Sequence, residues 1–225
     1  MWNLMCEKLV ENNERYEYIL TNTLLRLDDS TFNSAISNHT GKIYQKYSPA
    51  KTAWGNTAFF RRLLKTNDAA VDFYLSNGLL DSIATNISRY VCLRFLKIVM
   101  CAREVYLEAV LVHPQLWAIV MRTLKHGENY VARSRLAKYL IKACRVATPR
   151  QVLHLIECKA LIYALKIGMH EREFSLARDV RPIEAAIKKL AKTTSLAEGK
   201  VGKCLELVEE VLRRAGDRMA LQIDG

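Results

Sequence analysis

Proline and glycine are scarce in this 225-residue sequence, which contains four prolines and nine glycines. An all-β protein places turn residues about every ten positions, so this composition excludes that class. Half of the residues are hydrophobic and a quarter are charged, which argues against long disordered segments. Leu, Ala, Lys, Arg and Ile are abundant instead. The composition therefore predicts an all-α protein.

Cys-x-x-Cys pairs and long uninterrupted hydrophobic runs are also missing. Residues 1–6 lead straight into charged positions, unlike a secretory signal, and the most apolar stretch, 105–121, is interrupted by Glu108, His113 and Pro114. We therefore expect an intracellular protein, cytoplasmic or nuclear, without a membrane span. In that compartment the six cysteines are expected to be reduced and mostly buried. They are Cys6, Cys92, Cys101, Cys144, Cys158 and Cys204.

No motif of an enzyme or of a metal or cofactor site is present. His154 and Cys158 are four residues apart, which could place them on one side of a helix, but no further ligand or catalytic partner has a fitting spacing. The segment 170–173 lacks the second histidine of a zinc protease, and the glycines of 199–203 lack the spacing of a phosphate-binding loop. We therefore expect a protein without catalytic residues, metal or cofactor.

Helical segments recur from residue 67 onward in the order short, short, long. Start and stop signals at Gly78, His113–Pro114, Gly127 and Thr148–Pro149 separate them. The second helices begin near residues 79, 115 and 160, so the period is 36 and then 45 residues, close to the 40–47 residues of helical solenoid repeats. The predicted helices are 67–77, 79–87, 88–102, 103–112, 115–124, 128–146, 148–157, 160–167 and one from His170 that ends or kinks at Arg181–Pro182.

The segments on either side of 67–192 are predicted to cap these repeats, so that residues 1–225 form one domain. The N-terminal cap, 1–66, is expected to contain helices over Trp2–Leu27 and Thr31–Tyr47 and a third that starts at Ser48–Pro49 and carries Trp54. The C-terminal cap, 193–216, starts with Thr193–Ser195 and is stopped by Gly216, and 217–225 is a tail. An irregular helical bundle is the alternative architecture.

The turns between the short helices resemble those of armadillo repeats. Residues Tyr74–Ile83 match the family's pattern of a helix, a glycine turn and a Leu-rich helix closely, and Leu155–Ile162 match it with Lys159 in place of the glycine. Residues Leu111–Leu116 match in outline. The resemblance covers about 67–192 and implies a right-handed α-solenoid of armadillo or HEAT type with about three repeats.

Within that superfamily the chain is similar to the armadillo subunit of the Ccr–Not mRNA deadenylase complex, the "required for cell differentiation" family. The similarity starts at Val91–Cys92 with Phe95 and Ile98, although Leu93 replaces the family's Asn, and it does not extend to 1–66. It implies a non-enzymatic scaffold with a basic groove for peptides, with nucleic acid as an alternative ligand. Phosphatase regulatory subunits and nuclear-import adaptors share the same repeat and remain alternatives. The other matching positions are Asn129, Tyr130, Leu136, Thr148, Val152, Leu155, Ile162 and Ile167.

Positive charge is concentrated in one part of the chain, which has a net charge of +11. Between 122 and 150 eight basic residues accompany one acid, Glu128. Four of them are spaced 3, 4 and 3 apart and therefore share one side of the predicted helix. With Arg133 they form the predicted binding groove, whose partner is an acidic peptide or protein subunit or, alternatively, RNA or another polyanion. A solvated helix face is the competing interpretation. The four are Arg135, Lys138, Lys142 and Arg145.

Overall fold

The structure, a computed structural model, describes residues 2–11, 14–47, 57–87, 89–170, 180–181, 183–185, 187–188 and 198–223. All regular structure in these ranges is helical, as the composition predicts, and no helix there is long and apolar enough to cross a membrane. The chain divides into two compact units, Met1–Ile98 and Val99–Gly225, which we describe separately. The boundary falls inside one helix of the predicted repeat region.

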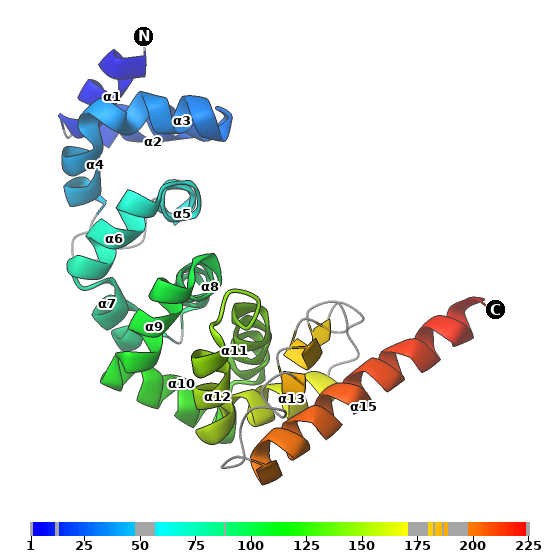
Figure 1. Ribbon diagram of the computed structural model, residues 1–225. Helices are drawn as coiled ribbons and strands as arrows, with labels where there is room; N and C mark the ends of the chain where they lie inside the picture. Colours follow the sequence, from blue (N-terminus) through cyan, green and yellow to red (C-terminus); the bar gives the residue numbers. More distant parts are fainter. Residues whose placement is uncertain are drawn as a thin grey trace. The chain divides into compact units, whose positions relative to one another are not determined.

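Unit 1 contains the predicted N-terminal cap and the first predicted repeat (Figure 1). Two helices, α1 and α2, form where one was predicted over 2–27. The start signal at Ser48–Pro49 and Trp54 lie outside the described residues. The elements are α1 Trp2–Val10, α2 Glu14–Leu25, α3 Asp29–Ile36, η1 Ser37–His39, α4 Thr40–Lys46, α5 Thr57–Thr66, α6 Asp68–Ser76, α7 Leu79–Thr85 and α8 Tyr90–Ala102.

Aromatic rings connect the helices of unit 1. Phe59 on α5 lies with its ring centroid 5.6 Å from Phe32 on α3 and 5.0 Å from Tyr47 after α4. Phe60, its neighbour, lies 4.6 Å from Tyr74 on α6 and 4.8 Å from Phe95 on α8. The centroid distances fall within the range of favourable edge and tilted contacts, each of which contributes about 0.5–1.5 kcal/mol beyond area burial. Helix α5 therefore anchors the core of this unit.

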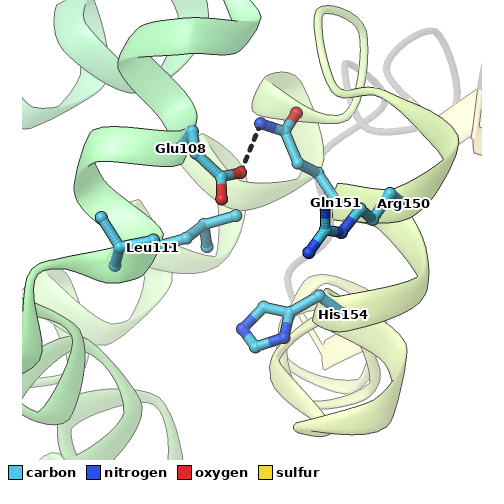
Figure 2. Close-up of a pocket in the computed structure, with 6 residues that line it drawn as sticks. Glu108, Leu111, Arg150, Gln151 and His154 are labelled. Atoms are coloured by element: carbon cyan, nitrogen blue, oxygen red, sulfur yellow. Dashed lines mark hydrogen bonds between the residues drawn. The ribbon is translucent and has the colours of Figure 1, made fainter.

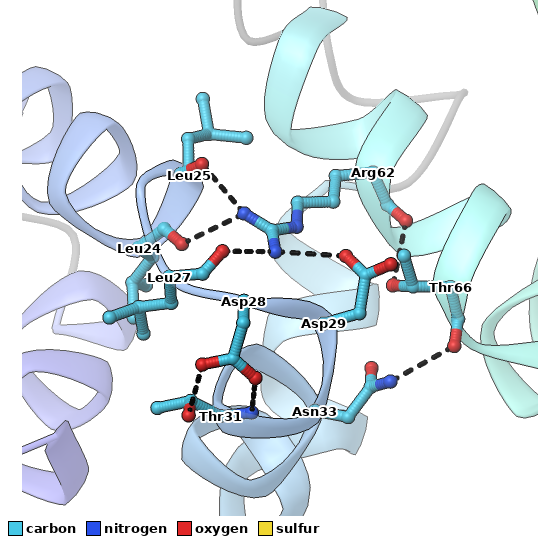
Figure 3. Close-up of polar contacts among 9 residues, drawn as sticks. All are labelled: Leu24, Leu25, Leu27, Asp28, Asp29, Thr31, Asn33, Arg62 and Thr66. Carbon is cyan, nitrogen blue, oxygen red and sulfur yellow. Dashed lines mark hydrogen bonds and ion pairs between the residues drawn. The ribbon is translucent and has the colours of Figure 1, made fainter.

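Arg62, about one turn after Phe59 on α5, binds the end of α2 (Figure 3). Its guanidinium donates to the carbonyl oxygens of Leu25 at 2.6 Å and Leu24 at 3.3 Å, and also to that of Leu27. The same group forms an ion pair with Asp29 at 3.0 Å and lies 4.4 Å from the ring centroid of Phe32. Carbonyls at the C-terminal end of a helix lack amide partners within the helix, so this half-buried cation supplies donors to three carbonyl oxygens at and just after the end of α2.

Unit 2 contains the end of α8 and the remaining predicted repeats (Figure 1). Helix α11 packs against α10 and α13, and α13 packs against α15. Helix α15 continues through Gly216, the predicted stop, because one glycine costs only about 1 kcal/mol in a helix. Pro182 and the predicted cap Thr193–Ser195 lie outside the described residues. The helices are α9 Glu104–Val112, α10 Pro114–His126, α11 Tyr130–Ala143, α12 Pro149–Glu157, α13 Ala160–His170 and α15 Glu198–Ile223.

The helix starts expected from the sequence are formed by side-chain caps. Thr148 Oγ1 accepts from the amide of Gln151 at 3.2 Å, and Gln151 Oε1 accepts from the amide of Thr148 at 2.9 Å, which completes a capping box. Asn67 and Asn129 cap α6 and α11 in the same manner, each accepting an amide three residues later at 3.1 Å. The start predicted at Thr148–Pro149 is confirmed.

Two turns between short helices share one unusual backbone conformation. Gly78 separates α6 from α7 with φ of 79°, and Lys159 separates α12 from α13 with φ of 66°. Both lie in the left-handed region, which costs a residue with a side chain about 1–2 kcal/mol. The two turns that resemble the armadillo pattern in sequence therefore also have the same geometry.

We predict that Arg62→Ala lowers the free energy of unfolding of unit 1 by about 2 kcal/mol, because the carbonyl oxygens of Leu25 and Leu27 lose the donor that Arg62 supplies. Arg62→Lys is expected to restore less than half of this loss, since an ammonium group cannot reproduce the planar fork. Urea unfolding followed by circular dichroism measures the effect. Arg61→Ala, which changes the exposed neighbour, is the matched control and should have almost no effect.

Substitutions in the two left-handed turns should change the free energy of unfolding in opposite directions. Lys159→Gly is expected to raise the free energy of unfolding by about 0.5–1 kcal/mol, and Gly78→Ala to lower it by about 1 kcal/mol. Gly41→Ala serves as a control, because Gly41 lies within α4 with open space around it and should gain stability instead. Thermal unfolding of the three variants gives the signs, and equal signs for the two turn variants would contradict the shared geometry.

Candidate functional site

Helix α11 carries the basic residues predicted as the binding groove, and its buried positions determine how it lies. Leu136 and Leu140 are fully buried and Ala143 and Ile141 are buried beside them, so α11 contributes a broad apolar surface to the core of unit 2. Gly127 ends α10, and the Asn129 cap starts α11 two residues later. The observed helix, Tyr130–Ala143, is therefore shorter at both ends than the predicted range 128–146.

The accessible side of α11 is basic from Ser134 to the end of the helix. Between Ser134 and Arg145 every residue that is not buried is an arginine or a lysine. They are Arg135, Lys138 and Lys142, which are half-buried, and Arg145, which is exposed in the turn after the helix. We call these four residues the α11 basic face. Ten residues of helix extend about 15 Å, so four positive charges lie along about three helical turns.

Arg133, the fifth predicted groove residue, lies off this face. Its Nε donates to the carbonyl oxygen of Leu124 at 3.1 Å, in the last turn of α10. Positions 133 and 135 are separated by about 200° around a helix, so the two arginines point to different sides. Arg133 thereby has a structural role, and a role in binding stays a prediction for this residue.

Aromatic side chains on α11 differ in their exposure. Tyr139 is only 9% exposed, and the carbonyl oxygen of the same residue accepts from Cys101 Sγ at 3.7 Å. Tyr130 and Val131 at the start of the helix are 60% and 53% exposed. Val131 lies four residues before Arg135 and so extends the α11 basic face with an apolar position. The face therefore has no aromatic platform for base stacking along its basic part.

Helix α8 repeats the same arrangement in unit 1, and sequence reasoning missed it. Arg94 and Lys97 precede Arg135 and Lys138 by 41 residues each (135 − 94 and 138 − 97), and they too lie on the accessible side of their helix. Arg94 lies 4.3 Å from the ring centroid of Tyr90, which is 43% exposed. An Arg-x-x-Lys pair at a 41-residue spacing was the available signal, because that spacing falls within the armadillo range.

A pocket between α9 and α12 is a second feature that the sequence did not reveal (Figure 2). It has a volume of about 250 Å³. Gln151 in its wall is buried and donates through Nε2 to Glu108 Oε2 at 2.8 Å and to the carbonyl oxygen of Glu104 at 2.9 Å. The pocket thus combines a fixed carboxylate with basic and apolar groups. Its lining residues are Glu108, Leu111, Val112, Arg150, Gln151 and His154.

His154 and Cys158 do not form a nucleophile and base. Cys158 Sγ donates to the carbonyl oxygen of Leu155 at 3.6 Å, and burial raises the pKa of its thiol, the opposite of what a reactive cysteine requires. His154 is exposed, with its ring 6.5 Å from that of Trp117. Among the described residues no group of three or more His, Cys, Asp or Glu side chains could hold a metal ion.

Comparison with known proteins identifies no relative: no family model, no curated protein and no solved structure matches this chain.

Arg133→Ala is expected to lower the free energy of unfolding of unit 2 by about 1 kcal/mol, because the carbonyl oxygen of Leu124 loses its donor at the end of α10. Arg122→Ala, an exposed arginine on α10 itself, is the matched control and should change stability by less than about 0.5 kcal/mol. Urea titration of both variants measures the difference. Equal stabilities would assign no structural role to the Arg133 contact.

Proposed function

We propose that this chain is a non-enzymatic binding protein whose α11 basic face holds an acidic segment of a partner protein. The observation that supports it most is the composition of the accessible side of α11, where every residue from Ser134 to Arg145 that is not buried is basic. A solvated helix face ordinarily mixes both signs of charge. Four cations over about 15 Å suit several carboxylates arranged along one peptide.

Burial along α11 favours a polypeptide partner over nucleic acid. Single-stranded nucleic acids are bound by cations combined with aromatic side chains on which bases stack, and Tyr139 is buried. Tyr130 and Val131 are exposed at the start of the face, and an apolar side chain next to an acidic cluster of a partner could pack there. Tyr and Arg are also enriched in protein–protein interfaces.

The proposed scaffold is a right-handed armadillo-type solenoid. Support comes from the recurring order of helices, from the left-handed turns at Gly78 and Lys159, and from the 41-residue spacing of the basic pairs on α8 and α11. In such a repeat each unit buries its apolar face against the next, and the last helix of the unit lines the binding surface. The sequence similarity to the Ccr–Not armadillo subunit makes a deadenylase complex the first assembly to test.

Charge reversal on α11 tests the proposed function. The probe is a fluorescein-labelled peptide of alternating Glu and Ser, with an alternating Lys and Ser peptide and a ten-nucleotide RNA for comparison. We expect the quadruple change of Arg135, Lys138, Lys142 and Arg145 to Glu to weaken binding of the acidic peptide about tenfold or more, measured by fluorescence anisotropy at low salt. Raising the ionic strength should also weaken binding of the acidic peptide to the wild-type chain.

The matched control reverses four exposed basic residues of unit 2 outside this face: Arg122, Lys125, Lys166 and Lys203. Each reversal changes the charge by two, so both quadruple variants fall from +11 to +3 (11 − 8). The control variant should retain acidic-peptide binding within about twofold. Equal losses in both variants would attribute binding to net charge alone and contradict the proposal. If the chain binds the RNA more tightly than the acidic peptide, and reversal of the α11 basic face abolishes this RNA binding, then the partner is nucleic acid and not an acidic segment.

A further inference from the structure

The pocket between α9 and α12 is small, and two of its lining residues, Leu111 and Gln151, are buried. Its volume of about 250 Å³ lies below the roughly 300–1,000 Å³ of typical small-molecule sites and suits one amino-acid residue. Leu111 in its lining is only 7% exposed and belongs to the core of unit 2, so the pocket is supported by packed structure. All six lining residues lie in unit 2.

Gln151 holds the polar part of the pocket in place. Its Oε1 accepts from the amide of Thr148 at 2.9 Å, and its Nε2 donates to the carbonyl oxygen of Glu104 and to Glu108 Oε2. The side chain is 6% exposed, and its three bonds use both the acceptor and the donor end of the amide. The carboxylate of Glu108 is therefore oriented before anything binds, which lowers the entropic cost of binding.

The two walls of the pocket offer opposite hydrogen-bonding groups (Figure 2). Glu108 on α9 presents a carboxylate, which accepts, and Arg150 and His154 on α12 point toward the same space with groups that donate. No ion pair joins Glu108 to Arg150 in the described part of the chain. One carboxylate and one guanidinium cancel in charge, so this pocket attracts no polyanion, in contrast to the α11 basic face.

Exposed valines extend the pocket into a larger apolar surface. Val112 lines the pocket and is 65% exposed, and Val105, seven residues earlier on the same side of α9, is 57% exposed. Glu108 lies between them on that side. A free metabolite would fill the pocket and leave Val105 uncovered, whereas a polypeptide could cover both valines. The surface therefore fits a chain segment.

We propose that this pocket is a second binding site, which takes one aliphatic residue of an extended, uncharged segment of a partner polypeptide. A peptide unit has one donor and one acceptor: its N–H suits the Glu108 carboxylate, and its carbonyl oxygen suits Arg150 and His154. The aliphatic side chain then packs on Leu111 and Val112. An extended segment is required, because a helix uses these main-chain groups internally.

Methyl NMR with a capped tripeptide, acetyl-Gly-Leu-Gly-amide, tests this inference on the full chain. We expect titration to shift the methyl signals of Leu111 and Val112. Arg150→Ala and Val112→Lys should each weaken binding about fivefold. Both residues are exposed, so the variants should fold. Arg122→Ala and Ala118→Lys change exposed residues of α10 that do not line the pocket, and both should leave binding unchanged.

Competing ligands determine which chemical class of ligand the pocket binds. Tighter binding of free leucine than of the capped peptide would assign the pocket to a free amino acid, and equal binding of acetyl-Gly-Glu-Gly-amide would remove the preference for an aliphatic residue; either result overturns the proposal. So does the absence of any methyl shift at the solubility limit of the peptide. Binding of the acidic peptide to the α11 basic face should be unaffected by Val112→Lys, so the two proposals fail independently.

Discussion

Short helices create many helix ends, and satisfying those ends is the constraint on which this structure depends. Each end leaves four carbonyls or four amides without a partner inside the helix. Here basic side chains donate to C-terminal carbonyls in both units: Lys46 to Leu9 at 2.6 Å, Arg62 to Leu24, Leu25 and Leu27, Arg133 to Leu124, and Lys200 to Glu157 at 3.0 Å. Each contact also joins two helices, so the cations connect helices as well as cap them.

This use of cations distinguishes basic side chains that donate to the end of another helix from those on the accessible side of α11. Arg133 and Arg135 are two residues apart on α11, yet Arg133 donates to the end of α10 while Arg135 lies on the accessible side. The α11 basic face therefore consists of cations that the apolar stripe of the helix leaves on the surface. A charge count alone cannot make this distinction, since it treats every arginine and lysine of the segment alike.

The pocket between α9 and α12 depends on the same constraint. Gln151 completes the cap of α12 and in doing so places its amide against Glu104 and Glu108 on α9. A residue that begins one helix thus orients the carboxylate of another. The two proposed sites differ chemically, because the α11 basic face carries charge of one sign and the pocket combines one acid with one base. They would recognise different segments, acidic for the first and uncharged for the second.

Local signals in the sequence determined the helical class, the cap at Thr148 and the left-handed turn at Gly78, because propensity, capping and backbone conformation depend on a few neighbouring residues. The 3, 4, 3 spacing likewise placed the four cations on one side of α11. The contact of Arg133 with the end of α10 and the pocket between α9 and α12 depend on how helices pack against one another. Only the tertiary structure decided these, because each joins residues of two different helices and contributes energy only once both helices are in place.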